Sequence, residues 1–139
     1  MQIRLGNEGW LAALLRAEAD IFSDAWGEAA LLSHLGASTS RTLIAEEDGA
    51  LCGYLLGSVI PPEGEVYRIA VLPEARRRGV GEALLSAFLK EVPTCFLEVR
   101  ESNAPARAFY EKHGFCLIAR RCGYYTHPKE DACIYKKEG

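Results

Sequence analysis

Residues 66–81 read Val66-Tyr67-Arg68-Ile69-Ala70-Val71-Leu72, Pro73-Glu74-Ala75 and Arg76-Arg77-Arg78-Gly79-Val80-Gly81. The first run is extended and apolar, as in a strand, and helical periodicity begins near Val80. Glycines 79 and 81 allow a tight turn and close approach of a ligand, while the next helix presents free N–H groups and its positive dipole end. The arginines add donors suited to phosphate oxygens. The stretch predicts a strand, an anion-binding turn that fits a diphosphate, and a helix.

Two common nucleotide-binding motifs do not fit this turn. A P-loop requires Lys-Ser or Lys-Thr after its last glycine, and neither pair follows Gly81. The dinucleotide-binding fingerprint requires a third glycine, which is missing. Spacing alone therefore leaves two interpretations open, an anion site or an ordinary turn with a solvated basic face.

Length and composition predict one soluble domain over residues 1–139. The chain has 139 residues, 49% of them hydrophobic and 25% charged, which is enough for one core of its own. Its apolar stretches fall short of the roughly 20 residues that span a bilayer, and residues 1–10 lack the pattern of a secretory signal. We expect a cytoplasmic protein that does not associate with membranes.

Charge and cysteine content narrow the classes of ligand. A net charge of −3 and a pI near 5.6 argue against general affinity for nucleic acid and leave room for a cationic substrate. The five cysteines are odd in number and include no C-x-x-C pair, which argues against a zinc site and a disulfide framework. His34, His113 and His127 are isolated in sequence, so we expect no bound metal.

Apolar periodicity predicts helices over 7–19, over 27–35 and from 80 until Pro93 ends the third. Strands are predicted over 42–46, 51–58, 66–72, 94–99, 115–125 and 132–135. Asp48-Gly49 is a strong hairpin signal between the first two of these strands. Asn103 is expected to cap a further helix that Gly114 ends. The expected order, βααβββαβαββ, indicates an α/β (α+β) fold with a mixed sheet.

The strand Ile69-Ala70-Val71 ending at Pro73, followed by R-x-x-G-x-G and Ala83-Leu84-Leu85, resembles the GNAT superfamily of N-acetyltransferases. The blocks Leu97-Glu98-Val99-Arg100-Glu101-Ser102-Asn103 and Ala108 to Phe115, with Tyr124-Tyr125, resemble the bacterial ribosomal-protein-alanine N-acetyltransferase family in particular. The resemblance covers nearly the whole chain. It implies a mixed, mostly antiparallel central sheet of six to seven strands, splayed in the middle and flanked by about four helices.

The resemblance implies acetyl-CoA as the cosubstrate and assigns its contacts. The backbone of the strand would pair with the pantetheine arm, the turn and helix start would hold the pyrophosphate, and Asn103 would add a polar contact. A strand edge and a helix N-terminus suit these groups physically. The residues assigned to the cofactor are Ile69, Ala70, Val71, Arg76, Arg77, Arg78, Gly79, Val80, Gly81, Glu82 and Asn103.

The resemblance also assigns Glu98 as general base and Tyr110 as general acid. A free glutamate has a pKa near 4.3, so a glutamate base for an ammonium needs burial or a bridging water. A tyrosine, with a pKa of about 10, gives up its proton only as charge develops on the leaving sulfur. Two alternatives stay open: Glu98 as a paired structural carboxylate and Tyr110 as a core aromatic.

The acceptor is expected to be the α-amine of a protein N-terminus, with an N-terminal alanine of a ribosomal small-subunit protein as the leading candidate. An α-amine, with a pKa of about 7.7–8.0, is more often neutral at cytosolic pH than a lysine at about 10.4. Arg68 and Gly123 depart from the family, which usually has a small polar residue and an asparagine there. The alternatives are a small-molecule amine, a lysine, or a non-catalytic acetyl-CoA-binding module, and the chain is expected to be a monomer or weak dimer.

Overall fold

The computed structural model describes residues 1–126 and 128–138, so His127 and Gly139 lie outside the described residues. Over these residues the element order is the predicted βααβββαβαββ. The helices are α1 (Leu11–Ile21), α2 (Glu28–Gly36), α3 (Val80–Leu89) and α4 (Ala104–Lys112). The strands are β1 (Gln2–Leu5), β2 (Ser40–Glu47), β3 (Ala50–Ile60), β4 (Glu63–Val71), β5 (Thr94–Arg100), β6 (Cys116–Thr126) and β7 (Lys129–Glu138).

The first helix starts later than the predicted residue 7. Residues Glu8–Trp10 form a short 3-10 turn instead, and the Asn7 side chain accepts a hydrogen bond from the Gly9 N–H at 2.9 Å. Asn7 thus caps the 3-10 turn, and α1 continues from it. Within the described part of the chain, no helix is long and apolar enough to cross a membrane.

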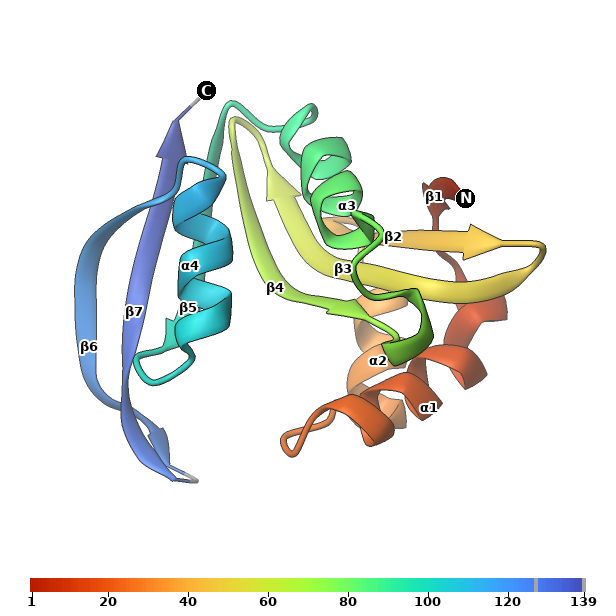
Figure 1. The fold of residues 1–139 in the computed structure, drawn as a ribbon, viewed down its shortest axis with the longest axis horizontal. Helices are drawn as coiled ribbons and strands as arrows, with labels where there is room; N and C mark the ends of the chain where they lie inside the picture. The colour runs from red at the N-terminus through yellow and green to blue at the C-terminus, as the bar shows by residue number, and fades with distance from the viewer. Residues whose placement is uncertain (127, 139) are drawn as a thin grey trace.

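The strands form one sheet in the order β1-β2-β3-β4-β5-β7-β6 (Figure 1). Of the strand pairs in the described structure, only β4 and β5 run parallel, and the others are antiparallel. The mixed, mostly antiparallel sheet that the sequence predicts is therefore confirmed, with seven strands. α3 is the crossover that the parallel pair requires.

Alternation along the strands divides the core into two layers. In β3, Leu55 packs under α3 with Leu84 and Phe88, whereas Tyr54 and Leu56 face the opposite side and pack with α1 and α2. Successive side chains of a strand point to opposite faces, so one strand supplies both layers. The sheet is covered by α1 and α2 on one face and by α3 and α4 on the other.

The sheet splits between β4 and β5, as predicted. These strands pair only from Glu63 to Val66 with Thr94 to Leu97, and they diverge beyond that point (Figure 1). On its other side β4 keeps pairing with β3, except for a bulge that leaves Tyr67 between the pairs Gly57–Val66 and Leu56–Arg68. A β-bulge bends its strand and increases the local twist. The bulge therefore lies where β4 turns away from β5 and opens the sheet.

Candidate active site

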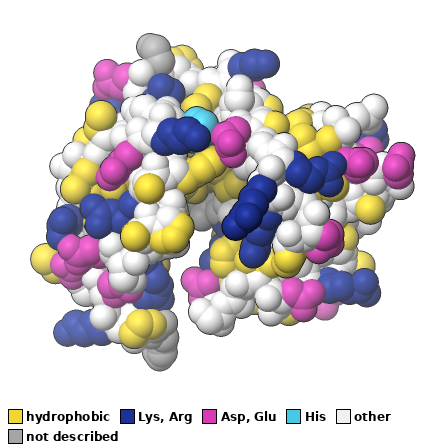
Figure 2. All heavy atoms as spheres, in the orientation of Figure 1, with side chains coloured by type: hydrophobic (Ala, Val, Ile, Leu, Met, Phe, Trp, Pro, Cys, Tyr) yellow, Lys and Arg dark blue, Asp and Glu magenta, His cyan; other side chains and the backbone are white. Residues whose placement is uncertain are grey.

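A cavity of about 690 Å³ passes through the split in the sheet. Its walls come from the end of α1, the end of β4, the β4–α3 turn and α4. Figure 2 shows a groove between the two halves of the molecule on this face, with Lys and Arg side chains along one edge. Because α1 and α4 cover opposite faces of the sheet, a ligand in this cavity can reach from one face to the other.

The β4–α3 turn has the geometry of an anion site. Gly79 precedes α3 with φ +74°, and no side chain caps the helix, which leaves its first N–H groups available. Arg77 also lies in the left-handed region, at φ +65°. Gly81 lines the cavity, and a Cβ on it would lie 3.5 Å from the Phe109 ring. The backbone here is open to a ligand.

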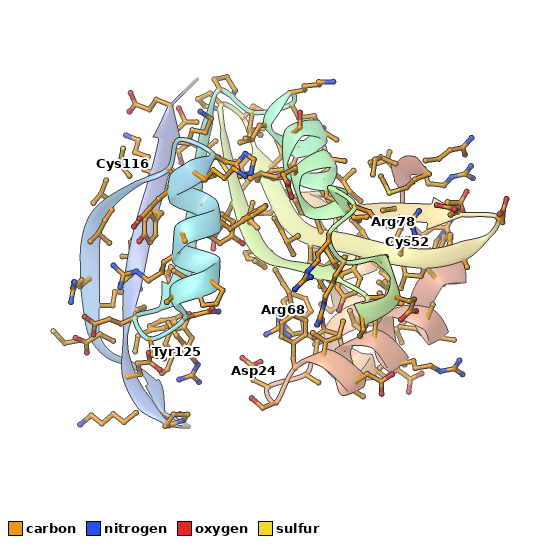
Figure 3. All side chains as sticks on the ribbon, viewed as in Figure 1. Asp24, Cys52, Arg68, Arg78, Cys116 and Tyr125 are labelled. Carbon is orange, nitrogen blue, oxygen red and sulfur yellow. The ribbon has the colours of Figure 1, made fainter. Side chains whose placement is uncertain are left out.

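The three consecutive arginines do not act as one group. Arg76 and Arg77 line the cavity, and Arg76 Nε donates to the Val71 carbonyl at 3.1 Å. Arg78 is outside the cavity lining and forms an ion pair with Glu47 (Figure 3). The structure thus brings two of the three arginines to the site and directs the third to the β2–β3 hairpin.

The edge of β4 is open along the cavity. Ile69, Ala70 and Val71 pair with β3 on one side and have no ladder to β5 on the other. The Asn103 side chain caps α4 by accepting from the Ala106 N–H at 3.2 Å, and it also lines the cavity. A free strand edge and an uncapped helix start with two arginines fit a long, amide-containing ligand that carries a diphosphate.

A second hollow, of about 320 Å³, adjoins the cavity on the α1 side of the sheet. In β5 the buried residues Cys95, Leu97 and Val99 face α3 and α4, so Glu98 between them faces this hollow. Asp24 and Tyr125 lie on opposite sides of it (Figure 3). The two spaces share the lining residues Ile21, Phe22, Ile69, Asn103, Ala106 and Tyr110.

Glu98 is a partly exposed carboxylate within the second hollow. Its side chain is 23% exposed, and its Oε1 lies 3.2 Å from Arg121 Nε of β6. Burial raises the pKa of Glu65 on β4, and the neighbouring Glu98 charge raises it further. Two carboxylates thus lie close enough to influence each other, and Arg121 acts on both of them.

Tyr110 is the buried polar side chain at the junction of the two spaces. Its ring packs in edge contact with Phe109 and Phe115, at 5.4 and 5.6 Å between centroids. Burial raises the pKa of Tyr110, and the Cys95 thiol below it raises it further. The same burial raises the pKa of Cys95 to about 12. The phenol therefore stays protonated at neutral pH and can donate a proton or a hydrogen bond.

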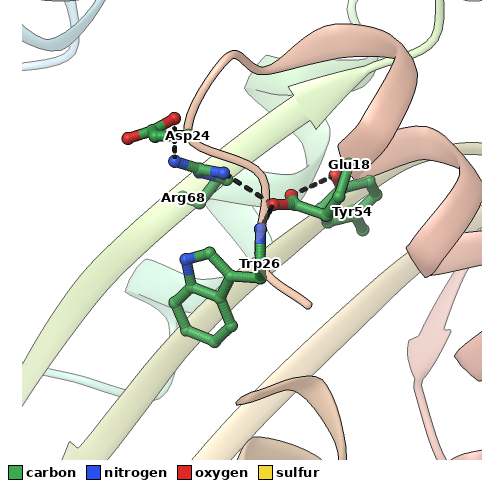
Figure 4. Close-up of polar contacts among 5 residues, drawn as sticks. All are labelled: Glu18, Asp24, Trp26, Tyr54 and Arg68. Atoms are coloured by element: carbon green, nitrogen blue, oxygen red, sulfur yellow. Dashed lines mark hydrogen bonds and ion pairs between the residues drawn. The ribbon is translucent and has the colours of Figure 1, made fainter. Parts of the chain in front are cut away.

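A polar network that the sequence did not predict supports one wall of the second hollow (Figure 4). Glu18 of α1 is fully buried and binds three groups: Arg68 Nη1 at 2.6 Å, the Tyr54 hydroxyl at 2.5 Å and the Trp26 N–H at 2.8 Å. Arg68 Nη2 also donates to Asp24 at 2.9 Å. The available signal was a glutamate at a helical position that continues the apolar face of α1.

Of the residues that the sequence analysis assigned to the site, Glu98 lines the second hollow, Tyr110 lines both spaces and Arg78 lines neither. The remaining assigned residues line the larger cavity: Ile69, Ala70, Val71, Arg76, Arg77, Gly79, Val80, Gly81, Glu82 and Asn103. Gly123, which replaces the family's usual asparagine, has φ +61° and donates its N–H to Asp131 at 2.8 Å. Both glycine and asparagine tolerate that conformation.

The family model "Acetyltransferase (GNAT) family" matches residues 11–115. The chain belongs to this family. It is 35% identical over 116 residues to the ribosomal protein bS18-alanine N-acetyltransferase of Escherichia coli K12, covering 78% of each chain. It is 34% identical over 121 residues to an N-alpha-acetyltransferase of Sulfurisphaera tokodaii, covering 74% of this chain and 72% of the relative.

The fold agrees with this relationship. The crystal structure of the E. coli ribosomal protein bS18-alanine N-acetyltransferase superposes with a TM-score of 0.90 at 30% identity, covering 99% of this chain and 92% of the relative. The open sheet and the uncapped α3 thus belong to a GNAT enzyme. The chain is an N-acetyltransferase, related to the ribosomal protein bS18-alanine N-acetyltransferases and to an N-alpha-acetyltransferase.

Proposed function

We propose that this GNAT enzyme transfers the acetyl group of acetyl-CoA to the α-amine of a protein N-terminus by direct attack while both substrates are bound. The observation that carries the proposal is the meeting of two spaces at Tyr110. The larger one has the anion-binding turn and the open strand edge, and the smaller one has Glu98. Two substrates that enter from opposite faces of the sheet would meet beside both side chains.

Acetyl-CoA fits the larger cavity. Its diphosphate matches the start of α3 with Arg76 and Arg77, and its amide-containing arm matches the free edge of Ile69 to Val71. The thioester would then lie near Tyr110, at the entrance to the second hollow. This placement needs no acetyl-enzyme, because the acceptor amine reaches the carbonyl carbon directly.

The proposed chemistry divides between two side chains. Glu98 accepts a proton from the acceptor ammonium, directly or through water, and the neutral nitrogen attacks the acetyl carbonyl carbon. The N–C bond forms, the C–S bond breaks, and Tyr110 gives its proton to the departing sulfur. The acetylated nitrogen releases its second proton to water, water returns a proton to the Tyr110 oxygen, and the proton on Glu98 leaves to solvent, so that one proton is released per turnover. The products are the acetamide and free CoA thiol.

The carboxylates of the second hollow support a cationic acceptor. Glu98, Glu65 and Asp24 lie at or beside it, and an ammonium group would share Glu98 with Arg121 and Asp24 with Arg68. An α-amine loses its proton more readily than a lysine side chain does. Since the E. coli relative is named for the alanine of ribosomal protein bS18, we propose an N-terminal alanine of a ribosomal small-subunit protein as the acceptor.

The test offers purified enzyme and acetyl-CoA three acceptors in separate reactions. Two are peptides, one with the free N-terminus of that ribosomal protein and one with its α-amine blocked and a lysine free, and the third is a small polyamine. Mass spectrometry of the acetylated product is the readout, because Cys116 and Cys122 are exposed and would react with thiol reagents. Acetylation of the free α-amine alone supports the proposal. Acetylation of only the lysine or the polyamine would show that the acceptor is a lysine side chain or a small-molecule amine and not an α-amine.

We expect kcat to show no decline on the alkaline side up to about pH 10. The acid form of Tyr110 is the protonated phenol, and burial raises its pKa above the ordinary value of about 10. Because its pKa is raised, the Tyr110 phenol stays protonated and can act as the acid below pH 10. The measurement is kcat from pH 7 to 10 with circular dichroism to confirm folding. A decline below pH 10 that Tyr110→Phe abolishes would contradict this assignment.

Arg77→Ala is expected to weaken acetyl-CoA binding by roughly 10-fold or more, since a hydrogen bond to a charged group contributes about 1.5–3 kcal/mol. Arg78→Ala is the matched control, because Arg78 pairs with Glu47 outside the cavity. We expect it to change the dissociation constant less than about twofold. Isothermal titration with CoA measures both. Equal losses for the two variants would mean that the arginines act only as a common positive patch.

A further inference from the structure

Arg68 lines the second hollow, and its guanidinium is held by side chains of a neighbouring helix and turn. Its Nη1 donates to buried Glu18 and its Nη2 to Asp24. The guanidinium carbon lies 3.8 Å from the centre of the Phe22 ring, and the side chain is 12% exposed. Both terminal nitrogens and one flat face of the guanidinium are therefore in contact with residues of α1 and of the turn after it.

These contacts join the α1–α2 turn to the strand that flanks the reacting groups. Arg68 stands on β4 next to Ile69, and the turn carries Phe22 and Asp24. Glu18 holds the far end of the same turn by accepting the Trp26 N–H. A planar guanidinium that makes two charge-assisted contacts and stacks on a ring fixes the distance between its neighbours. The position of this wall thus depends on Arg68.

The wall faces the place where the first residue of an acceptor would lie. Phe22, Arg68 and Ile69 line the hollow on one side, with Glu98 and Tyr110 also in its lining. An acceptor whose nitrogen lies at Glu98 and Tyr110 has its first side chain within this hollow. The Arg68 side chain lies across Phe22, and moving it aside for a larger group would break its contacts with Glu18 and Asp24.

We propose that Arg68 is the specificity-determining residue for the first side chain of the acceptor, restricting it to a small one by clamping Phe22 and Asp24 against β4. The inference rests on the proposed α-amine acetylation and adds the source of its selectivity. Arg68 is a positioning residue: its Nη1 and Nη2 donate to Glu18 and Asp24, and its positive charge does not attract an ammonium.

The experiment compares kcat/KM for two peptides that differ only in a first residue of alanine or leucine. In Arg68→Ala the alanine-to-leucine ratio is expected to fall about 10-fold or more, the scale on which a pocket discriminates one or more methylene groups. The KM for acetyl-CoA should stay within about twofold, because the larger cavity does not include Arg68. Arg4→Ala, which removes a distant ion pair to Glu46, should leave the ratio unchanged.

A second variant covers the case in which Arg68→Ala does not fold. Asp24→Ala removes only the contact of Arg68 with Asp24 and keeps the Arg68–Glu18 pair. The Asp24 side chain is 54% exposed, so the substitution should cost little stability. The ratio is expected to fall in the same direction but less. An unchanged ratio in a folded Arg68→Ala enzyme, or in Asp24→Ala if the first does not fold, would overturn the proposal.

Hydrogen exchange separates this proposal from the proposed function. In Arg68→Ala, or in Asp24→Ala if that variant does not fold, the amides of residues 22–26 should exchange faster than in the wild type, whether or not any peptide is a substrate. If the wild-type enzyme acetylates neither peptide, the α-amine function fails, and unchanged exchange would refute the clamp as well. If the wild type acetylates both peptides equally, the function stands and the size restriction fails.

Discussion

Replacing Glu98 by glutamine is expected to lower kcat for peptide acetylation by about 100-fold or more. The substitution keeps the size of the side chain and one hydrogen-bond acceptor, but an amide does not accept a proton from an ammonium. Positioned acid–base groups contribute typically 10²- to 10⁴-fold to a rate. The measurement is kcat at saturating acetyl-CoA, together with titration of CoA, whose affinity should not change because Glu98 does not line the larger cavity.

The neighbouring carboxylate supplies the control. Glu65→Gln removes one negative charge from beside the same hollow and leaves Glu98 with Arg121. If the two carboxylates act only through their negative charge, Glu65→Gln and Glu98→Gln will reduce the rate to a similar degree. If Glu98 accepts the proton, Glu65→Gln will raise the acceptor KM by less than about fivefold and leave kcat nearly unchanged. A kcat within about fivefold of wild type in Glu98→Gln would remove the base assignment.

Local signals were sufficient for much of the fold. Asp48-Gly49 predicts a hairpin because both residues tolerate positive φ, and they have φ +52° and +81° between β2 and β3. Gly114 ends α4 at φ +92°, as expected for a glycine after a helix. In each case the conformation is decided by one or two residues. Such features are therefore readable without knowledge of tertiary contacts.

Features that depend on distant residues were not predictable in the same way. The run of three arginines looks uniform in sequence, yet the side chains point in different directions. Arg77 has a left-handed backbone, and Arg78 contacts Glu47, which is 31 residues earlier. Arg68 and Glu18 are 50 residues apart, and no local pattern links them. The last strand is also longer than the predicted 132–135, since β7 pairs with β5 as far as Glu138.

The Glu18 network is expected to have the largest effect on stability. Glu18→Ala would leave the Tyr54 hydroxyl, the Trp26 N–H and the half-paired Arg68 guanidinium without the carboxylate that they share. Breaking a buried ion pair by removing one partner costs about 3–5 kcal/mol. We therefore expect the free energy of unfolding to fall by that amount and Tm to fall by roughly 10–20 °C. Denaturant titration and thermal unfolding measure the two quantities.

A triple variant separates stability from function in this network. Glu18→Leu, Tyr54→Phe and Arg68→Met together remove the buried charges and hydroxyl, and replacing a buried ion pair by apolar residues of similar volume is often neutral for stability. The triple variant should therefore unfold at a smaller cost than Glu18→Ala alone. A loss as large as that of Glu18→Ala would show that the network mainly stabilises the fold. A stable triple variant that no longer distinguishes alanine from leucine would show that the charged contacts of Arg68 are needed for selectivity and not for the stability of the fold.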